Sequence, residues 1–184
     1  MTKTSWIVLA IVVVLVLWVW GSYNGFVSAN QAVDNQWAKV EGQYQRRLDL
    51  IPNLVATVQG IAKQEQTVFK ALADARASYA GAKNVNEKVS AANNLEGALS
   101  RLLVIVENYP DLKSSQNFLS LQAQLEGTEN RISVERARFN DTVNLFNVKT
   151  QRFPSILIGR IFGFHARAYF SSTAGAAVPP KVNF

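Results

Sequence analysis

The stretch from Val33 to Tyr79 reads VDNQWAKVEGQYQRRLDLIPNLVATVQGIAKQEQTVFKALADARASY. Its apolar stripe advances by alternating steps of four and three residues through Val33, Trp37, Val40, Tyr44, Arg47, Ile51, Leu54, Val58, Ile61, Glu65, Val68, Leu72, Ala75 and Tyr79. Twelve of these fourteen positions are apolar, counting Ala and Tyr, and the exceptions are Arg47 and Glu65. Such heptad spacing keeps one face of a helix against a partner helix, so it predicts a long helix in a coiled-coil-like bundle.

An apolar run from Trp6 to Trp20 precedes this stretch. Uncharged neighbours extend it to about 20–24 residues, enough to cross a hydrocarbon core of about 30 Å. A cleaved signal peptide ending near Ala29 is the alternative. The long gap to that site and the aromatic residues at both ends favour an uncleaved, single-pass anchor over residues 1–27; these aromatic residues are Trp6, Trp18, Trp20 and Tyr23.

The formal charge of +6 is unevenly distributed along the 184 residues. Thirteen basic residues balance the thirteen acids of the middle of the chain, whereas the five basic residues from Lys149 onward have no acid among them. Lys3 is the only charged residue before Asp34, and the next basic residue is Lys39. The positive-inside rule therefore places the N-terminus in the cytoplasm and the bundle outside.

The residue types exclude several chemistries. The chain has no Cys, so disulfides, thiolate zinc sites, a Cys nucleophile and a lipidated Cys are excluded. His165 is the only histidine, and Glu126 and Glu129 lack the Glu-x-x-His spacing of helical metal sites. We therefore expect no enzyme, catalytic residue, metal, cofactor or small-molecule substrate. Nucleic acid is disfavoured as a partner because the positive charge is sparse and the chain is anchored.

Pro52 divides the long stretch into two alternatives. Proline removes a backbone donor and clashes with the carbonyl of Leu48, so the helix either kinks there or reverses there. The unbroken phase and the lack of Gly between Leu48 and Leu54 favour one kinked helix over residues 28–80, ended by Gly81.

Further helices are predicted at 85–107, with Asn84 and Glu87 as a capping box, and at 115–151. Residues 152–184 then form a basic aromatic tail with a disordered end. The fold class is all-α: a transmembrane helix leading into an antiparallel up-and-down bundle of three to four helices. A kinked first helix gives three helices and sends the tail away from the membrane. A reversal at Pro52 gives four helices and returns the tail to it.

The two polar positions on the stripe, Arg47 and Glu65, are about 27 Å apart along a straight helix and cannot pair with each other. One interpretation leaves each in water at the rim of the bundle. The other gives each an opposite charge from another helix, which would fix register more than stability. The candidates are Arg131, Arg136 or Arg138 for Glu65, and Glu129 or Glu135 for Arg47.

The tail combines aromatic rings with arginines, a composition that suits an anionic membrane surface. Its candidate lipid contacts are Arg160, Phe162, Phe164 and Arg167. The alternative is a segment folded against the bundle.

Several longer motifs occur in one order along the chain. They are Arg46-Arg47-Leu48-Asp49-Leu50-Ile51-Pro52-Asn53-Leu54-Val55, Glu107-Asn108-Tyr109-Pro110-Asp111-Leu112-Lys113, and Thr128-Glu129-Asn130-Arg131-Ile132 leading to Arg136 and Asn140. Together with Tyr23-Asn24, Trp37, Glu65, Arg76 and Phe153-Pro154 they resemble the bacterial LemA family. The resemblance implies a bacterial membrane-anchored helical bundle, and it transfers no catalytic residues. Some members of the family resemble proteins linked to bacterial membrane organelles.

We therefore expect a non-enzymatic protein of the bacterial inner membrane whose bundle acts as a scaffold or assembly module. Its partners would be the lipid bilayer and either further copies of the chain or other envelope proteins. The residues expected to set register or subunit contacts are Arg47, Pro52, Glu65, Arg76, Glu129, Asn130, Arg136 and Asn140. The alternative function is a lipid-binding or membrane-shaping module that uses the C-terminal segment.

Overall fold

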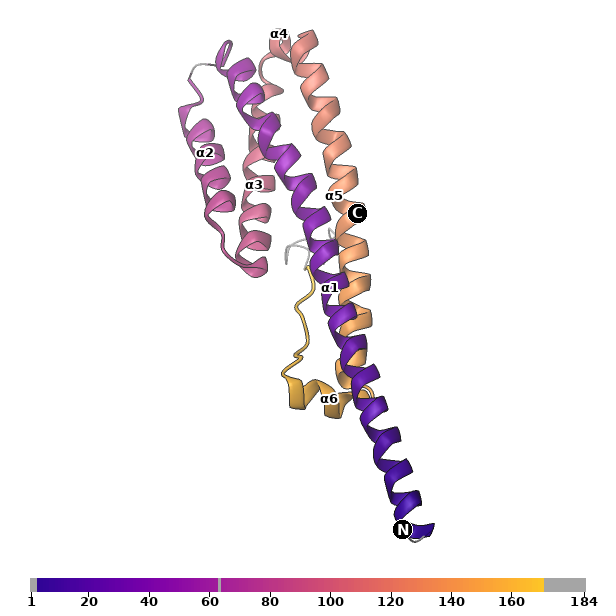
Figure 1. The fold of residues 1–184 in the computed structure, drawn as a ribbon. Coiled ribbons are helices and arrows are strands. Elements are labelled where there is room, and N and C mark those ends of the chain that lie inside the picture. Colours follow the sequence, from indigo (N-terminus) through magenta and orange to yellow (C-terminus); the bar gives the residue numbers. More distant parts are fainter. Residues whose placement is uncertain (1–2, 63, 171–184) are drawn as a thin grey trace, which may run out of the picture. The chain divides into compact units, whose positions relative to one another are not determined.

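The computed structural model describes residues 3–62 and 64–170. It contains α1 (Lys3–Gln59), α2 (Gln66–Gly81), α3 (Val85–Val106), α4 (Pro110–Lys113), α5 (Gln116–Gln151) and α6 (Ser155–Phe162). No strand occurs within the described ranges, and the predicted all-α class is confirmed. Figure 1 labels these helices. The chain divides into two compact units, and both α1 and α5 contribute to each of them.

The prediction of one helix continuing to residue 80 is wrong, because α1 ends at Gln59 and α2 begins at Gln66. α1 continues through Pro52, and the chain reverses after Gly60 instead. Gly has a poor helix propensity, and the heptad count runs across this turn only by a coincidence of spacing. Ile61 is exposed and Glu65 is half-buried, so neither belongs to the core.

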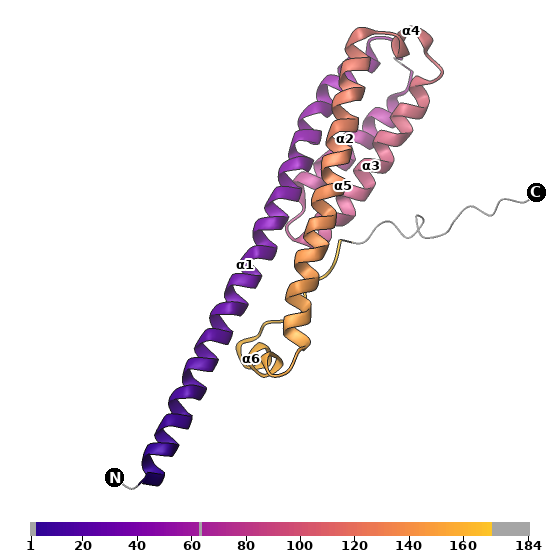
Figure 2. The same ribbon diagram turned by 90° about the vertical axis from the view of Figure 1, so that its right-hand side faces the viewer.

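One unit, Val40–Arg136 with Phe170, contains four antiparallel helices: the end of α1, then α2, α3 and the start of α5 (Figure 2). The single-turn α4 connects α3 to α5. The helices follow the four-helix order, reached by a turn at Gly60 rather than at Pro52. Asn84 caps α3 by accepting a hydrogen bond from the Glu87 backbone at 2.9 Å. The core contains the fully buried Val40, Tyr44, Leu54, Val58, Leu72, Leu95, Leu102, Leu112 and Ile132.

The other unit joins residues up to Lys39 with Ala137–Tyr169. The ring centroids of Trp37 and Phe139 are 5.4 Å apart, and those of Phe26 and Phe146 are 6.3 Å apart. The order of these pairs shows that α1 and α5 run antiparallel here. The tail predicted from residue 152 is partly helical, because it contains α6. The end expected to be disordered, residues 171–184, lies outside the described residues.

The first part of α1 exposes its large apolar side chains, from Trp6 at 61% to Leu17 at 58%. Within the described residues, α1 is the one helix long and apolar enough to cross a membrane. Trp6 and Trp20 are exposed and Trp18 is half-buried. Tyr23 lies where this apolar stretch meets α6, with its ring centroid 4.9 Å from that of Phe162.

Candidate functional site

Arg47 is the centre of a buried charged network in the four-helix unit. Only 3% of this residue is exposed, because the heptad phase of α1 points it inward between α3 and α5. Its guanidinium forms an ion pair with Glu129 and lies 3.7 Å from a carboxylate oxygen of Glu96. Its Nε donates a hydrogen bond to the Thr128 hydroxyl at 3.4 Å. The structure thus gives Arg47 one of the two acidic partners suggested by the sequence, and adds Glu96.

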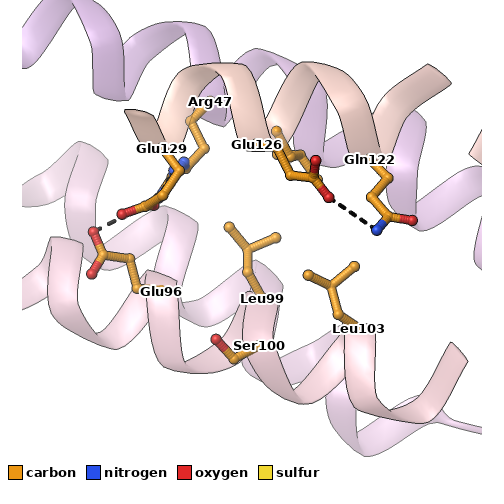
Figure 3. Close-up of a pocket in the computed structure, with 9 residues that line it drawn as sticks. Arg47, Glu96, Leu99, Ser100, Leu103, Gln122, Glu126 and Glu129 are labelled. Atoms are coloured by element: carbon orange, nitrogen blue, oxygen red, sulfur yellow. Dashed lines mark hydrogen bonds and ion pairs between the residues drawn. The ribbon is translucent and has the colours of Figure 1, made fainter. Parts of the chain in front are cut away.

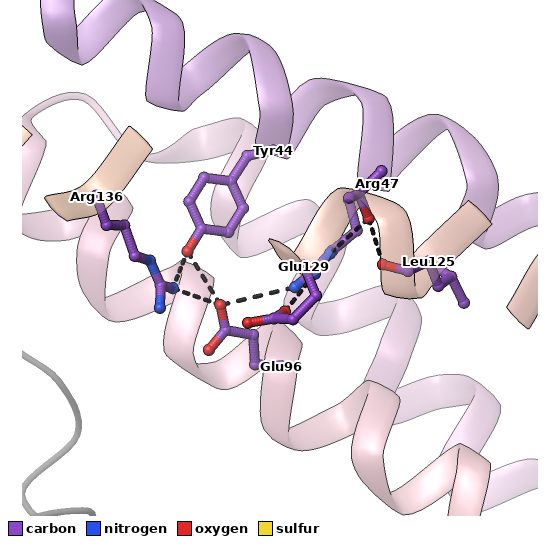
Figure 4. A network of polar contacts seen from close by, with 7 residues as sticks. Tyr44, Arg47, Glu96, Leu125, Glu129 and Arg136 are labelled. Atoms are coloured by element: carbon purple, nitrogen blue, oxygen red, sulfur yellow. Dashed lines mark hydrogen bonds and ion pairs between the residues drawn. The ribbon is translucent and has the colours of Figure 1, made fainter. Parts of the chain in front are cut away.

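Glu96 on α3 connects Arg47 to a second arginine. Arg136 on α5 forms an ion pair with Glu96 and donates a hydrogen bond to the Tyr44 hydroxyl. Tyr44 in turn donates to Glu96 at 3.0 Å. Figure 4 shows these side chains in one row from Arg136 to Arg47, crossing α1, α3 and α5. Two arginines and two glutamates make the network neutral overall, which is how buried charges are tolerated.

Aromatic rings enclose the Arg136 end of this row. The Arg136 guanidinium lies 4.3 Å from the Phe170 ring centroid, within the range of a cation–π contact. The Tyr44 ring is 5.3 Å from that of Tyr79 on α2, so all four helices contribute. Burial, followed by the nearby Glu96 carboxylate, raises the pKa of Tyr44 above its ordinary value, and burial raises the pKa of Tyr79 to about 12. Both hydroxyls therefore stay protonated at neutral pH.

A cavity of about 320 Å³ lies beside Arg47, Glu96 and Glu129, between α3 and α5. Leu99, Leu103 and Leu125 form its apolar wall, as the first two show in Figure 3. At its far end Gln122 donates a hydrogen bond to Glu126 at 3.1 Å. Arg47 is paired with Glu96 and Glu129 at this cavity. No group of three His, Cys, Asp or Glu within residues 3–62 and 64–170 is placed to hold a metal. The arrangement fixes helix positions and presents no activated nucleophile.

The other residues expected to set register lie outside this row. Glu65 accepts a hydrogen bond from the Tyr109 hydroxyl at 3.3 Å, which replaces the arginine partners that the sequence suggested. Burial, together with Glu65, raises the pKa of Tyr109 above its ordinary value. Pro52 and Arg76 are exposed and line a separate cleft between α1 and α2. Asn130 is exposed, and Asn140 is half-buried in the other unit.

Glu96, Tyr44 and Thr128 are network members that the sequence analysis did not identify as partners of Arg47. Glu96 follows Leu95 directly on the edge of the apolar stripe of α3, one turn after Ala92. The available signal was an acid, Glu96, beside the buried stripe of α3, which could have been paired with Arg47 on the stripe of α1.

The C-terminal segment is held against α1 at two of its four expected lipid contacts. Phe164 stacks on Phe26 with ring centroids 4.9 Å apart. Arg167 donates to Asn30 at 2.8 Å and pairs with Asp34 at 3.2 Å. Phe164 and Arg167 thus fit the alternative of a folded segment, whereas Arg160 and Phe162 remain exposed.

An antiparallel helical bundle, a neutral charged network inside it and an exposed apolar N-terminal helix define the class: an all-α protein in which one helix of the described residues is both long and apolar enough to cross a membrane. The model of the LemA family matches residues 36–184, and the chain belongs to the LemA family. The resemblance identified from the sequence motifs is therefore confirmed.

The curated relatives of this chain include three magnetosome proteins. Magnetosome protein MamQ of Magnetospirillum gryphiswaldense is 26% identical over 183 residues, which covers 85% of this chain and 67% of that protein. Magnetosome proteins MamQ 1 and MamQ 2 of Paramagnetospirillum magneticum are each 24% identical, with the same coverage of both chains.

Proposed function

We propose that this LemA-family chain is a non-enzymatic, single-pass protein of the bacterial inner membrane whose helical bundle serves as a scaffold. The observation that carries the proposal is the continuity of α1. One helix contains both the exposed apolar stretch and Arg47, the centre of the buried network. A helix that joins an anchor to a bundle of fixed register suits a protein that presents a constant surface.

The apolar stretch supports the anchor because most of its large apolar side chains stay exposed. Leu15, Val16 and Leu17 are each more than half exposed. Soluble proteins rarely leave large contiguous apolar patches in water. Resistance of the full chain to extraction from membranes by alkaline carbonate would support the anchor, and release into the soluble fraction would contradict it.

The network supports the scaffold role because it joins helices although burying its charges costs free energy. Buried ion pairs contribute little net stability, and setting register is their best-attested use. A bundle with a unique register can present the same surface in every copy, as assembly with further copies or other envelope proteins requires.

Crosslinking in native membranes tests assembly directly. The chain has no Cys, so single cysteines at the exposed Lys83, Ser100 and Arg131 can be joined by a bifunctional maleimide. We expect dimers or larger species from at least one position, and none from the Cys-free parent. Monomer alone at every position would contradict assembly.

Orientation follows from the same variants. A membrane-impermeant maleimide should label Lys83→Cys and Arg131→Cys in intact spheroplasts if the bundle lies outside the cytoplasm. Labelling only after lysis would show that the bundle lies in the cytoplasm, opposite to the proposed orientation. A cysteine at Lys149 would be a poorer labelling site because this residue is half-buried, with its ammonium 5.0 Å from the Phe26 ring centroid.

A further inference from the structure

α6 has two different faces. Ile158 is only 2% exposed and Gly159 is buried, because this face packs on α1. A Cβ on Gly159 would lie 3.5 Å from the Phe26 ring, so the missing side chain permits close approach of the two helices. On the other face Leu157 is 49% exposed and Ile161 is 73% exposed, one helical turn apart. Phe153, just before α6, is 77% exposed.

α6 meets the apolar surface of α1 through Phe162. Phe162 at the end of α6 lines an apolar groove of about 470 Å³ together with Leu15, Val16, Val19, Trp20 and Tyr23. α6 therefore lies beside the C-terminal end of the apolar stretch, where a spanning helix leaves the hydrocarbon layer. Figures 1 and 2 show α6 crosswise to α1, in side view in the first and end-on in the second.

Two exposed arginines accompany the exposed face of α6. Arg160 is exposed between Leu157 and Ile161 along the helix, and Arg152 is exposed just before it. On the packed side, the Lys149 ammonium lies 5.0 Å from the centroid of the Phe26 ring of α1, the same ring that Gly159 of α6 approaches. No acidic residue occurs between Asp141 and Phe170. An apolar stripe with arginines beside it is the pattern of a helix that lies in the interface of an anionic bilayer.

We propose that α6 lies flat in the headgroup layer of the bilayer face at which α1 emerges, with Leu157, Ile161 and Phe153 inserted and Arg152 and Arg160 on phospholipid phosphates. This inference rests on the proposed membrane anchor. Phe164 and Arg167 position the segment by binding α1, so the lipid contact belongs to the helix rather than to the whole tail. The occupant of the exposed face is thus the bilayer itself.

Depth-dependent quenching in vesicles tests this placement with the full chain. Single cysteines carrying an environment-sensitive dye are placed at Leu157, Ile161, Leu15 and Val134. Leu15 reports on the anchor, and Val134 on α5 is an exposed control, with 48% of its surface accessible. The vesicles contain phosphatidylcholine and phosphatidylglycerol with a spin label either near the headgroup or deep in the acyl chain.

We expect the dyes at 157 and 161 to be quenched by the shallow label, the dye at 15 by the deep label, and the dye at 134 by neither. If 157 and 161 behave like 134 while 15 is quenched, the placement of α6 is overturned and the anchor stands. If 15 is not quenched, the anchor itself fails. Crosslinked dimers through residue 157 without lipid quenching would assign this face to a second copy and overturn the proposal.

The headgroup contact has its own test. Arg152→Gln with Arg160→Gln should lower shallow quenching at residue 157 in vesicles that contain phosphatidylglycerol. The equilibrium ratio of inserted to released α6 should fall by about fivefold for each arginine removed. In pure phosphatidylcholine the same pair of substitutions should change little. Equal quenching of parent and variant in both kinds of vesicle would overturn the proposed contact with anionic headgroups.

Discussion

Glu96 is the residue on which the charged network depends, because two arginines share its carboxylate. Arg47 lies 3.7 Å from the same oxygen that pairs with Arg136 and accepts the Tyr44 hydroxyl. Glu129 is a lesser partner because half of its side chain is exposed, so water can replace some of what it supplies. Removing the charge of Glu96 would leave two arginines with one acid between them.

We therefore expect Glu96→Gln to lower the free energy of unfolding by about 3 kcal/mol, the cost of leaving a buried charge without its partner. Glu126→Gln is the matched control, since Glu126 is an exposed acid at the far end of the same cavity. It should change stability by less than about 0.5 kcal/mol. Thermal unfolding of the full chain in detergent, followed by circular dichroism, measures both. Equal effects of the two substitutions would show that the network carries no special weight.

Tyr79 makes the bundle less stable at alkaline pH. Its pKa rises from 10.0 to about 12 on folding because the hydroxyl is buried. The folded state holds this proton more tightly than the unfolded chain, so the contribution is complete below pH 10 and is lost as pH rises from 10 to 12. In Tyr79→Phe, the free energy of unfolding should fall less steeply between pH 10 and pH 12 than in the parent, as measured by chemical denaturation at several pH values. An unchanged slope would mean that Tyr79 does not titrate with unfolding.

At the scale of elements, the sequence predicted helices better than it predicted where they end. The ranges 85–107 and 115–151 lie close to α3 and α5, since capping by Asn84 and the turn at Tyr109-Pro110 are local signals. The turn at Gly60 was missed because Ile61 and Glu65 continue the heptad count without being buried. Glu129 was found as a partner of Arg47, but Glu96 was not, because pairing across helices depends on the topology that this turn sets.

Pro52 offers a test at the same scale, since it lies inside α1 without ending it. Proline leaves the Leu48 carbonyl without its helical donor and costs about 3 kcal/mol in a helix interior. Its exposed ring has little packing to lose, so Pro52→Ala should stabilise the bundle by about 1–3 kcal/mol. Chemical denaturation measures the change. Destabilisation instead would show that α1 needs the proline to reach its register, as the sequence analysis expected of this position.

At the scale of the whole molecule, the two units differ in net charge. Val40–Arg136 holds eleven basic and eleven acidic residues, whereas the residues up to Lys39 together with Ala137–Tyr169 hold seven basic and two acidic ones. The excess therefore accompanies the apolar stretch and α6, and the unit with the buried network is neutral. This division fits one unit that meets an anionic membrane surface and one that is built for packing.

Gly159 holds α6 against α1 in the unit that contains the apolar stretch. A Cβ there would be in ordinary contact with Phe26 and the Phe164 carbonyl, at 3.5 Å and 3.6 Å, so alanine fits but a longer side chain does not. Gly159→Leu should therefore release α6 from α1 and raise amide hydrogen exchange across Ser155–Phe162 by about tenfold or more. Gly159→Ala should change exchange little, and Gly42→Leu is the control because nothing lies within 4 Å of a Cβ at Gly42. Unchanged protection in Gly159→Leu would mean that the membrane, rather than α1, holds α6 in place.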